Sequence, residues 1–204
     1  MSKIEIHNIE ELILKEYPQE VIEKLLNDIL VLSLLVKDDY PDYKEWYQSK
    51  QIPGIYDGTR NIIIAHIKDR IVGFVSLKKT KEEKKICTFY VEKSFRKNQI
   101  GTILVEKAIE YLEEEKPLIT IPMNKLNQFI RISNKYNWEI SDIKENLYRT
   151  TTPEVIVNGT IEEKNGLLIP SKKLSKTYRI YKITRKKESI KILFTKTQFL
   201  WKNN

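Results

Sequence analysis

The chain has 204 residues, of which 41% are hydrophobic and 10% aromatic. This composition is typical of a globular protein with a sizeable core, and it excludes a disordered or fibrous chain. The apolar stretches are far shorter than the roughly 20 residues that a membrane-spanning helix requires, and the polar start MSKIEIHN lacks the apolar centre of a secretory signal. We therefore expect a cytosolic protein that has no membrane partner.

Cysteine and histidine are scarce. The single cysteine, Cys87, excludes an internal disulfide, which fits a reducing compartment. The only histidines, His7 and His66, lie far apart in the sequence. Because a zinc site usually needs several such ligands, no metal site is expected.

The positive charge is concentrated near the C-terminus. The net charge of the whole chain is +8. Segment 172–202 holds eleven Lys or Arg residues and one acidic residue, Glu188, so its net charge is +10 and the remainder carries −2. This asymmetry makes RNA, in tRNA or the ribosome, or another anionic surface a reasonable partner of segment 172–202. The alternative is that these lysines only keep β-structure soluble and its edges unpaired.

The first part of the chain predicts a strand, a helix and an aromatic segment. Ile4–Ile6 is a short strand candidate, and apolar residues recur from Gln19 to Val36 at the spacing of a helix with one buried face. The segment Tyr40–Gly58 is rich in aromatic residues and is interrupted by proline and glycine, so we expect a short helix and a loop. Its aromatic side chains either line a pocket or pack over a sheet edge.

The middle of the chain predicts an antiparallel sheet that continues into a parallel unit. Three segments rich in β-branched and aromatic residues predict consecutive antiparallel strands at Asn61–Ile67, Ile71–Lys78 and Lys85–Val91. A helix over Gly101–Glu115 and a strand over Leu118–Ile121 follow. Because this strand, helix and strand form a right-handed crossover, the two strands should be parallel.

The remaining elements complete a mixed α+β fold. A helix is expected over Lys125–Tyr136, and strands are expected over Trp138–Ile143 and Tyr148–Val157. The prediction is a mixed, mostly antiparallel sheet flanked by helices in residues 1–159, followed by a small, basic and β-rich extension in residues 160–204. The strands expected in this extension are Leu167–Ile169, Tyr178–Thr184 and Ile190–Phe194.

The segment after Val91 has the pattern of a phosphate site. A strand ends at Val91, a polar loop follows, and a helix begins near Gly101. Unpaired backbone N–H groups at a helix start bind anions together with the helix dipole. The loop is neither a Walker loop nor a dinucleotide fingerprint, because G-x-x-x-x-G-K-[ST] and G-x-G-x-x-G are both absent.

The loop sequence RKNQIG, residues 96–101, resembles the pyrophosphate-binding loop of the Gcn5-related N-acetyltransferase (GNAT) superfamily, [QR]-x-x-G-x-[GA]. Arg96 and Gly101 match this pattern, whereas Gln99 stands where glycine is usual. The run KKICTFYVEKSFRKNQIGTIL is similar to a bacterial branch with KICT-x-x-V before the loop, and Asn137-Trp138 replaces a frequent Gly-Phe pair. The resemblance covers about residues 1–159 and implies the GNAT fold.

The resemblance also implies acetyl-coenzyme A (acetyl-CoA) as co-substrate, without a metal. By this resemblance, the main chain of Tyr90 and Val91 hydrogen-bonds the pantetheine arm. An exposed strand edge suits such a contact, because an extended pantetheine can pair with it as a strand would. The implied contacts with the pyrophosphate are Arg96, Lys97, Asn98, Gln99, Ile100, Gly101 and Thr102.

Proton transfer has three candidate donors. Many members of the superfamily place a Tyr as general acid five residues before the Phe of the Gly-Phe pair, and this position is Ser133 here. Tyr136, nearly one helical turn further on, and Tyr148 are the alternatives. Where some relatives have a carboxylate base, this chain has Lys85, and Glu92 is a nearby alternative.

Cys87 has two interpretations. It alternates with Phe89 along one strand face, so we expect a small buried hydrophobic residue. The alternative is a covalent acetyl-cysteine intermediate. Neither His7 nor His66 is expected beside the thiol, which disfavours this alternative.

These features predict an N-acetyltransferase that moves an acetyl group from acetyl-CoA to an amine by direct attack in a ternary complex. The acceptor is an amine linked to RNA or an amine of a protein, and the basic segment favours RNA. The rival hypothesis is a catalytically weak or inactive binding module of GNAT fold, which uses its basic segment to hold nucleic acid or a partner protein. Gln99, Ser133 and Lys85 favour this rival, because each departs from the family pattern.

Overall fold

Seven strands form one sheet in the computed structural model, which describes residues 3–34 and 40–161. The strand order is β1-β2-β3-β4-β5-β7-β6, and every neighbouring pair is antiparallel except the parallel pair of β4 and β5. This arrangement confirms the predicted mostly antiparallel α+β fold. The strands are β1 Ile4–Asn8, β2 Arg60–Ile67, β3 Arg70–Lys79, β4 Lys84–Val91, β5 Leu118–Pro122, β6 Ile140–Lys144 and β7 Glu154–Val157.

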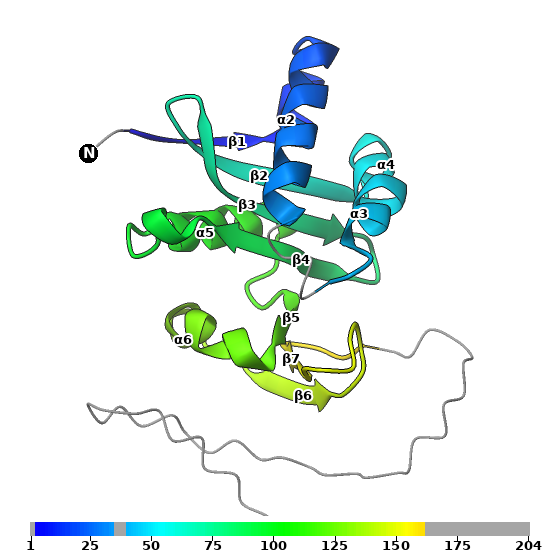
Figure 1. Cartoon of the computed structure of the whole chain (residues 1–204), viewed down its shortest axis with the longest axis vertical. Coiled ribbons are helices and arrows are strands. Elements are labelled where there is room, and N and C mark those ends of the chain that lie inside the picture. Colours follow the sequence, from blue (N-terminus) through cyan, green and yellow to red (C-terminus); the bar gives the residue numbers. More distant parts are fainter. Residues whose placement is uncertain (1–2, 35–39, 162–204) are drawn as a thin grey trace, which may run out of the picture. The chain divides into compact units, whose positions relative to one another are not determined.

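Helices cover both faces of the sheet (Figure 1), with α2, α3 and α4 in front of it and α5 behind it. The short helix α1, which the sequence analysis did not predict, begins where the side chain of Asn8 accepts a hydrogen bond from the Glu11 N–H group. The α-helices are α1 Ile9–Leu14, α2 Gln19–Ser33, α3 Tyr43–Trp46, α4 Ile52–Tyr56, α5 Ile100–Leu112 and α6 Leu126–Lys135.

The central strands are buried on both faces and divide the core into two clusters. Ile62 and Ile64 of β2 pack with the helices α1 to α4. Ile63 and Ala65, which alternate with them, pack with α5 on the other face. Because both sets are at most 2% exposed, burial of apolar surface on two sides holds β2 in a single register.

The aromatic segment differs from its prediction as a short helix and a loop. It is helical as far as Tyr56, because a π-helical turn at Tyr47–Gln51 joins α3 to α4. In a regular helix the ring of Pro53 would clash with the carbonyl group four residues earlier, and the wider π turn changes this spacing. Gly54 has another role: a Cβ atom there would lie 2.5 Å from the Cδ atom of Arg60, so glycine lets this side chain pass.

The strand predicted over Tyr148–Val157 is shorter in the structure. Only Glu154–Val157 forms β7, which lies between β5 and β6. Pro153 has no N–H group to extend the ladder, and its carbonyl oxygen instead accepts a hydrogen bond from Met123 at 2.9 Å. Tyr148 therefore belongs to a loop between β6 and β7.

Helix α6 ends as the Asn137-Trp138 pair requires. Asn137 has φ +51°, a left-handed conformation that glycine and asparagine adopt most readily. The N–H group of Trp138 donates to the carbonyl oxygen of Ser133 at 2.8 Å, and its indole N–H donates to the carbonyl oxygen of Glu115 at 2.9 Å. An asparagine thus takes the place of the usual glycine, and the following aromatic residue is buried.

Strands β4 and β5 pair over only two positions and then separate. The pairs are Lys85 with Leu118 and Ile86 with Ile119. Directly after them, Cys87 is an extra residue in β4, because Ile86 faces Leu77 of β3 while Thr88 faces Ser76. Such a β-bulge bends its strand, so β4 turns away from β5 and a fork opens between them.

The predicted extension 160–204 lies almost wholly outside the described residues, as do its three expected strands. In the part of the chain that the structure describes, no helix combines the length and hydrophobicity needed to cross a membrane. The same residues contain no cluster of three or more His, Cys, Asp or Glu side chains suited to a metal ion.

Candidate active site

A pocket lies in the fork between β4 and β5. Its walls include Cys87, Thr88 and Phe89 of β4, and Thr120 of β5. Tyr40, which precedes α3, closes one side. One of the two expected roles of the aromatic segment is therefore found, since Tyr40 lines the pocket, whereas Tyr43 and Tyr47 pack on the face of β2 and β3 rather than over a sheet edge.

The open edge of β4 offers main-chain groups beyond the fork. The N–H group of Glu92 donates to the carbonyl oxygen of Val72 on β3 at 2.9 Å. By the alternation of a strand, Tyr90 also directs its main chain toward β3, where it faces Phe74, whereas Phe89 and Val91 face the open edge. The register thus places Val91 where a pantetheine contact was predicted and turns the main chain of Tyr90 away.

The start of α5 leaves three backbone N–H groups without helical partners. The first bond of the helical pattern runs from Ile103 to the carbonyl oxygen of Gln99 at 3.0 Å, and no side chain caps the helix. The N–H groups of Ile100, Gly101 and Thr102 have no hydrogen-bond partner among the described residues. Together with the helix dipole, they form a site that attracts an anion.

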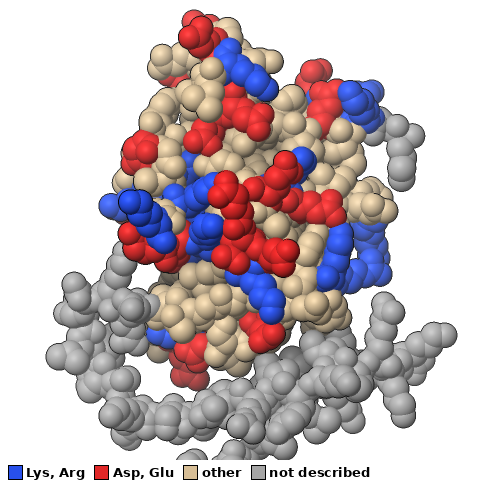
Figure 2. Space-filling view, turned by 180° about the vertical axis from the view of Figure 1, so that it is seen from behind, with Lys and Arg blue, Asp and Glu red and all other residues tan. Residues whose placement is uncertain are grey.

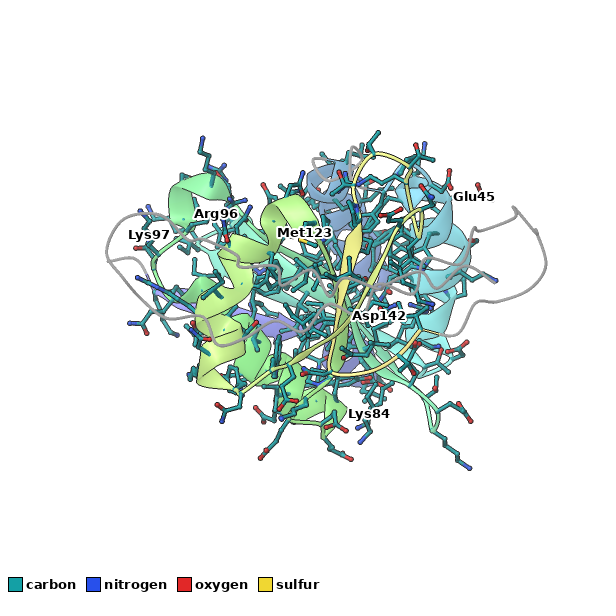
Figure 3. The ribbon with its side chains drawn as sticks, turned by 90° about the horizontal axis from the view of Figure 1, so that it is seen from below. Glu45, Lys84, Arg96, Lys97, Met123 and Asp142 are labelled. Atoms are coloured by element: carbon teal, nitrogen blue, oxygen red, sulfur yellow. The ribbon has the colours of Figure 1, made fainter. Side chains whose placement is uncertain are left out.

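The loop before α5 has an unusual backbone. Lys97 has φ +70° and Gln99 has φ +63°, both in the left-handed region. A residue with a side chain costs roughly 1–2 kcal/mol there, which explains in physical terms why a glycine is usual at the position of Gln99. The Arg96 Nε–H group donates to the carbonyl oxygen of Val91 at 3.0 Å and ties the loop to the end of β4. Figure 3 shows Arg96 and Lys97 next to each other, on the side opposite Glu45 of α3.

Gly101 is needed for a close contact with the fork. A Cβ atom at this position would lie 3.3 Å from the Cζ atom of Phe89. Phe89 also packs against Phe129 of α6, with ring centroids 5.6 Å apart. The start of α5 and the pocket wall are therefore in contact through one aromatic ring.

None of the three predicted proton donors lines the pocket, but Tyr148 contacts the lining residue Tyr40. Its ring meets Tyr40 edge to face at 5.3 Å, and its hydroxyl accepts a hydrogen bond from the Lys85 Nζ atom at 3.5 Å. The hydroxyl of Tyr136 instead lies 3.3 Å from the Glu106 carboxylate on α5. Ser133 lies in α6 and is not a lining residue of the pocket.

The two predicted positions for a base are at opposite ends of β4. The Glu92 carboxylate is bound to Arg70 at 2.6 Å and accepts a hydrogen bond from Ser94 at 2.8 Å. Lys85 is half-buried beside Tyr148. Burial lowers the pKa of Lys85, but nearby Tyr148, Cys87 and Glu83 outweigh burial and raise the pKa overall. Lys85 therefore stays a cation.

Cys87 lines the pocket and is half-buried, which differs from the expectation of a buried hydrophobic residue. The reason is its place in the bulge, which breaks the alternation of β4. The Arg60 guanidinium donates to its Sγ atom at 3.6 Å. Burial raises the pKa of the thiol, although Lys85 and Arg60 act in the opposite direction. His7 and His66 pack on each other on β1 and β2, away from this strand.

Sequence reasoning missed a group of buried hydroxyls behind the pocket. The hydroxyl oxygens of Tyr43 and Ser76 have no hydrogen-bond partner among the described residues. Burial raises the pKa of Tyr43, while Thr88 and Ser33 lie close enough to lower it in part. Thr88 lines the pocket, so this group extends from the fork into the core. The aromatic segment was the only sequence signal for it.

Residues 13–125 match the model of the acetyltransferase (GNAT) family, which is more than half of the chain. No curated protein matches the sequence. A putative acetyltransferase of the GNAT family from Desulfovibrio desulfuricans aligns with a TM-score of 0.55 at 11% identity and covers 76% of this chain and 97% of its own. Naa50 of Arabidopsis thaliana, solved in complex with the bisubstrate analogue CoA-Ac-MVNAL, aligns with a TM-score of 0.53 at 15% identity and covers 78% and 99%.

Nourseothricin acetyltransferase aligns with a TM-score of 0.45 at 14% identity, over 50% of this chain. This chain spans only 65% of that protein's length. At these identities the structural neighbours show the fold alone. The bacterial branch suggested by the run before the loop stays a prediction.

Slow alkylation of Cys87 is the first expected outcome. Thiolate is the reactive form, and a raised pKa keeps the thiol protonated to a higher pH than free cysteine. The pH of half-maximal alkylation by iodoacetamide should therefore lie above that of free cysteine, which mass spectrometry can follow over a pH series. Cys87 is the only cysteine, so Cys87→Ser gives a clean blank. A half-maximal pH below that of free cysteine would show an activated thiol and contradict this expectation.

Proposed function

The chain belongs to the GNAT family of acetyltransferases, and we propose that it transfers the acetyl group of acetyl-CoA to an amine in the fork between β4 and β5. One observation carries this proposal. The open edge of β4 runs from the pocket toward the unpartnered N–H groups at the start of α5. An extended strand edge followed by an anion site matches the pantetheine and the pyrophosphate of one acetyl-CoA molecule in their covalent order.

The proposed cofactor contacts follow the register. Val91 pairs with the pantetheine as predicted, and Phe89 takes the place of Tyr90, because its main chain faces the open edge. The N–H groups of Ile100, Gly101 and Thr102 hold the pyrophosphate. Arg96, Lys97, Asn98 and Gln99 complete the loop around it, with the two cations adding charge to the amide donors.

The proposed chemistry is direct attack in a ternary complex. A neutral amine attacks the thioester carbonyl carbon, and the new C–N bond forms as an oxyanion develops. The intermediate then breaks its C–S bond, the nitrogen gives up one proton, and the departing thiolate of CoA takes up one. Tyr148 is the predicted donor that lies beside the pocket, since its ring contacts Tyr40.

The acceptor that we propose is an amine of a protein or an amine linked to RNA. A protein amine fits the architecture shared with Naa50, whose bisubstrate analogue includes MVNAL. The basic segment 172–202 supports RNA, whether tRNA or ribosomal. The face seen in Figure 2 carries acidic and basic side chains intermixed, so this face does not add a uniform basic surface.

Two substitutions at the start of α5 should weaken acetyl-CoA binding. Gly101→Asp places a negative charge beside the phosphates and pushes the Phe89 ring, which a Cβ atom would approach to 3.3 Å. It should abolish measurable binding. Arg96→Ala removes a charge-assisted contact and should cost about 1–3 kcal/mol. Calorimetry with acetyl-CoA measures both effects.

The matched control for these variants is Lys107→Ala, which removes a cation of α5 that pairs with Glu110 on the exposed helix surface. Its affinity for acetyl-CoA should equal that of the wild type. Wild-type protein without detectable affinity at millimolar acetyl-CoA would refute the cofactor site and favour the non-catalytic module.

The three candidate donors can be separated by turnover. Tyr148→Phe should lower kcat by about a hundredfold with acetyl-CoA binding intact, because it removes the hydroxyl beside the pocket. Ser133→Ala should lower kcat by less than about tenfold, since a hydroxyl of high pKa is a poor acid near neutrality. Tyr136→Phe is the matched control, because the hydroxyl that it removes contacts Glu106 instead. Equal kcat in all three variants would leave solvent as the donor.

RNA binding should depend on the basic segment and on salt. Lysines that neutralise phosphates release counterions, so the affinity should fall steeply as salt rises. Labelled tRNA and single-stranded RNA are titrated at two salt concentrations against the full chain and against a chain that ends at Gly159. Binding by the full chain alone would support RNA, whereas equal binding by both chains, or none at low salt, would leave a protein amine as acceptor.

A further inference from the structure

Two half-buried cations on the side of the pocket opposite the α5 face, Arg60 and Lys85, form no direct ion pair with a carboxylate of the described residues. The Arg60 guanidinium contacts only neutral groups: Gln51 Oε1 at 3.4 Å, Cys87 Sγ at 3.6 Å and the ring of Trp46 at 5.3 Å. Lys85 contacts the Tyr148 hydroxyl. A cation that is partly withdrawn from water is normally balanced by an anion, so these two suggest a missing partner.

The two cations share one face of the sheet. Arg60 of β2 faces Lys78 of β3, which in turn faces Lys85 of β4, and residues directly opposite each other project to the same side. Lys78 is already paired with Glu83. Asp57 accepts hydrogen bonds from Thr59 rather than from Arg60. The row therefore keeps two cations without a direct ion pair among the described residues, and the carboxylates of Glu83 and Asp57 act on Lys85 and Arg60 only through space.

The pocket adjoins this pair of cations. Cys87 lines the pocket and contacts Arg60 directly. Tyr40 also lines the pocket, and its ring contacts the ring of Tyr148, whose hydroxyl accepts a hydrogen bond from Lys85. The thiol of Cys87 does not balance them, because burial raises its pKa and keeps it neutral. A ligand in the pocket can therefore place an anionic group beside Arg60 and Lys85.

The phosphates of acetyl-CoA are too far away to be that group. Six residues separate Lys85 from Val91, at the end of β4 that meets the phosphate loop. At about 3.3 Å per residue, this distance is about 20 Å. Figure 3 likewise shows Lys84, the neighbour of Lys85, well away from Arg96 and Lys97. In the proposed ternary complex, an anionic group bound beside Arg60 and Lys85 would therefore belong to the other substrate.

We propose that the acceptor is an amine that carries a carboxylate, and that Arg60 and Lys85 bind this carboxylate while the amine enters the fork. The inference rests on the proposed acetyl transfer. Two sources supply the same chemistry: the α-carboxylate of a free amino acid, and an acidic side chain near the N-terminus of a peptide. In both, the planar Arg60 guanidinium, stacked on Trp46, is suited to hold the two carboxylate oxygens.

The test follows thiol release from acetyl-CoA with acceptor pairs that differ in one carboxylate. Alanine against alaninamide tests the free amino acid, and an amidated peptide that begins Asp-Ala against one that begins Asn-Ala tests the peptide. In at least one of these two pairs, the kcat/KM of the wild type should be about tenfold or more higher for the acceptor that carries the extra carboxylate. Arg60→Gln and Lys85→Met should each reduce this ratio at least about threefold, and Arg60→Lys, which keeps the charge but not the planar fork, should reduce it less than Arg60→Gln does.

The matched control is Lys84→Met, one residue along β4, whose Nζ atom donates to the Glu113 carbonyl oxygen. It should leave both rates unchanged, and thermal unfolding verifies that every variant keeps its fold. The inference would be overturned if the wild type acted on both members of each acceptor pair at similar rates. It would also be overturned if Arg60→Gln and Lys85→Met both kept the preference for the acceptor with the extra carboxylate.

The absence of thiol release with every amine would refute the proposed function instead. The same pairs are then compared by their affinity for the protein in the presence of CoA. Tighter binding of a carboxylate member, lost in Lys85→Met, would still support the inference. Equal affinities within both pairs would overturn it.

Discussion

One extra residue in β4 determines the shape of the candidate site. Cys87 lies where the pairing of β4 with β5 stops, and the bulge turns the rest of β4 away from β5. A continuous ladder would have satisfied the main chain of Phe89 and Val91, and the bulge leaves this edge open at the cost of those hydrogen bonds. The Arg96 side chain recovers one of them, at the carbonyl oxygen of Val91. The strand edge that the proposed cofactor needs is thus a direct result of a local irregularity.

The phosphate loop depends on the same strand through Phe89. Its ring contacts Gly101 at the start of α5 and Phe129 of α6, and it forms part of the pocket wall. A shift of β4 at the fork therefore moves the helix start that holds the anion site. The left-handed residues Lys97 and Gln99 are tolerated in this loop because the packing around it fixes where the backbone must run.

The regular elements could be predicted from the sequence, whereas the site geometry could not. Segments rich in β-branched and aromatic residues placed β2, β3 and β4 within one residue of their ends, because such side chains are typical of strands that pack in a core. A bulge at Cys87 leaves the composition of its strand unchanged, so the alternation suggested a buried residue. The contact of Arg60 with Cys87 joins residues 27 positions apart, and no local pattern indicates such a pair. The contact of Tyr148 with Tyr40 likewise joins residues far apart in the sequence, so no local pattern indicates it.

The start of β4 has Lys85 where some relatives have a carboxylate base, and the proposed site offers another way to lower the pKa of the acceptor amine. An amine must lose its proton before it can attack, and many acetyltransferases need a base for this step. A cation near an ammonium group lowers its pKa, because like charges disfavour the charged form. Lys85 and Arg60 would act in this way on an acceptor bound beside them, and they would hold its carboxylate at the same time. A lysine where relatives have a base is therefore consistent with catalysis, provided that the acceptor brings its own negative charge.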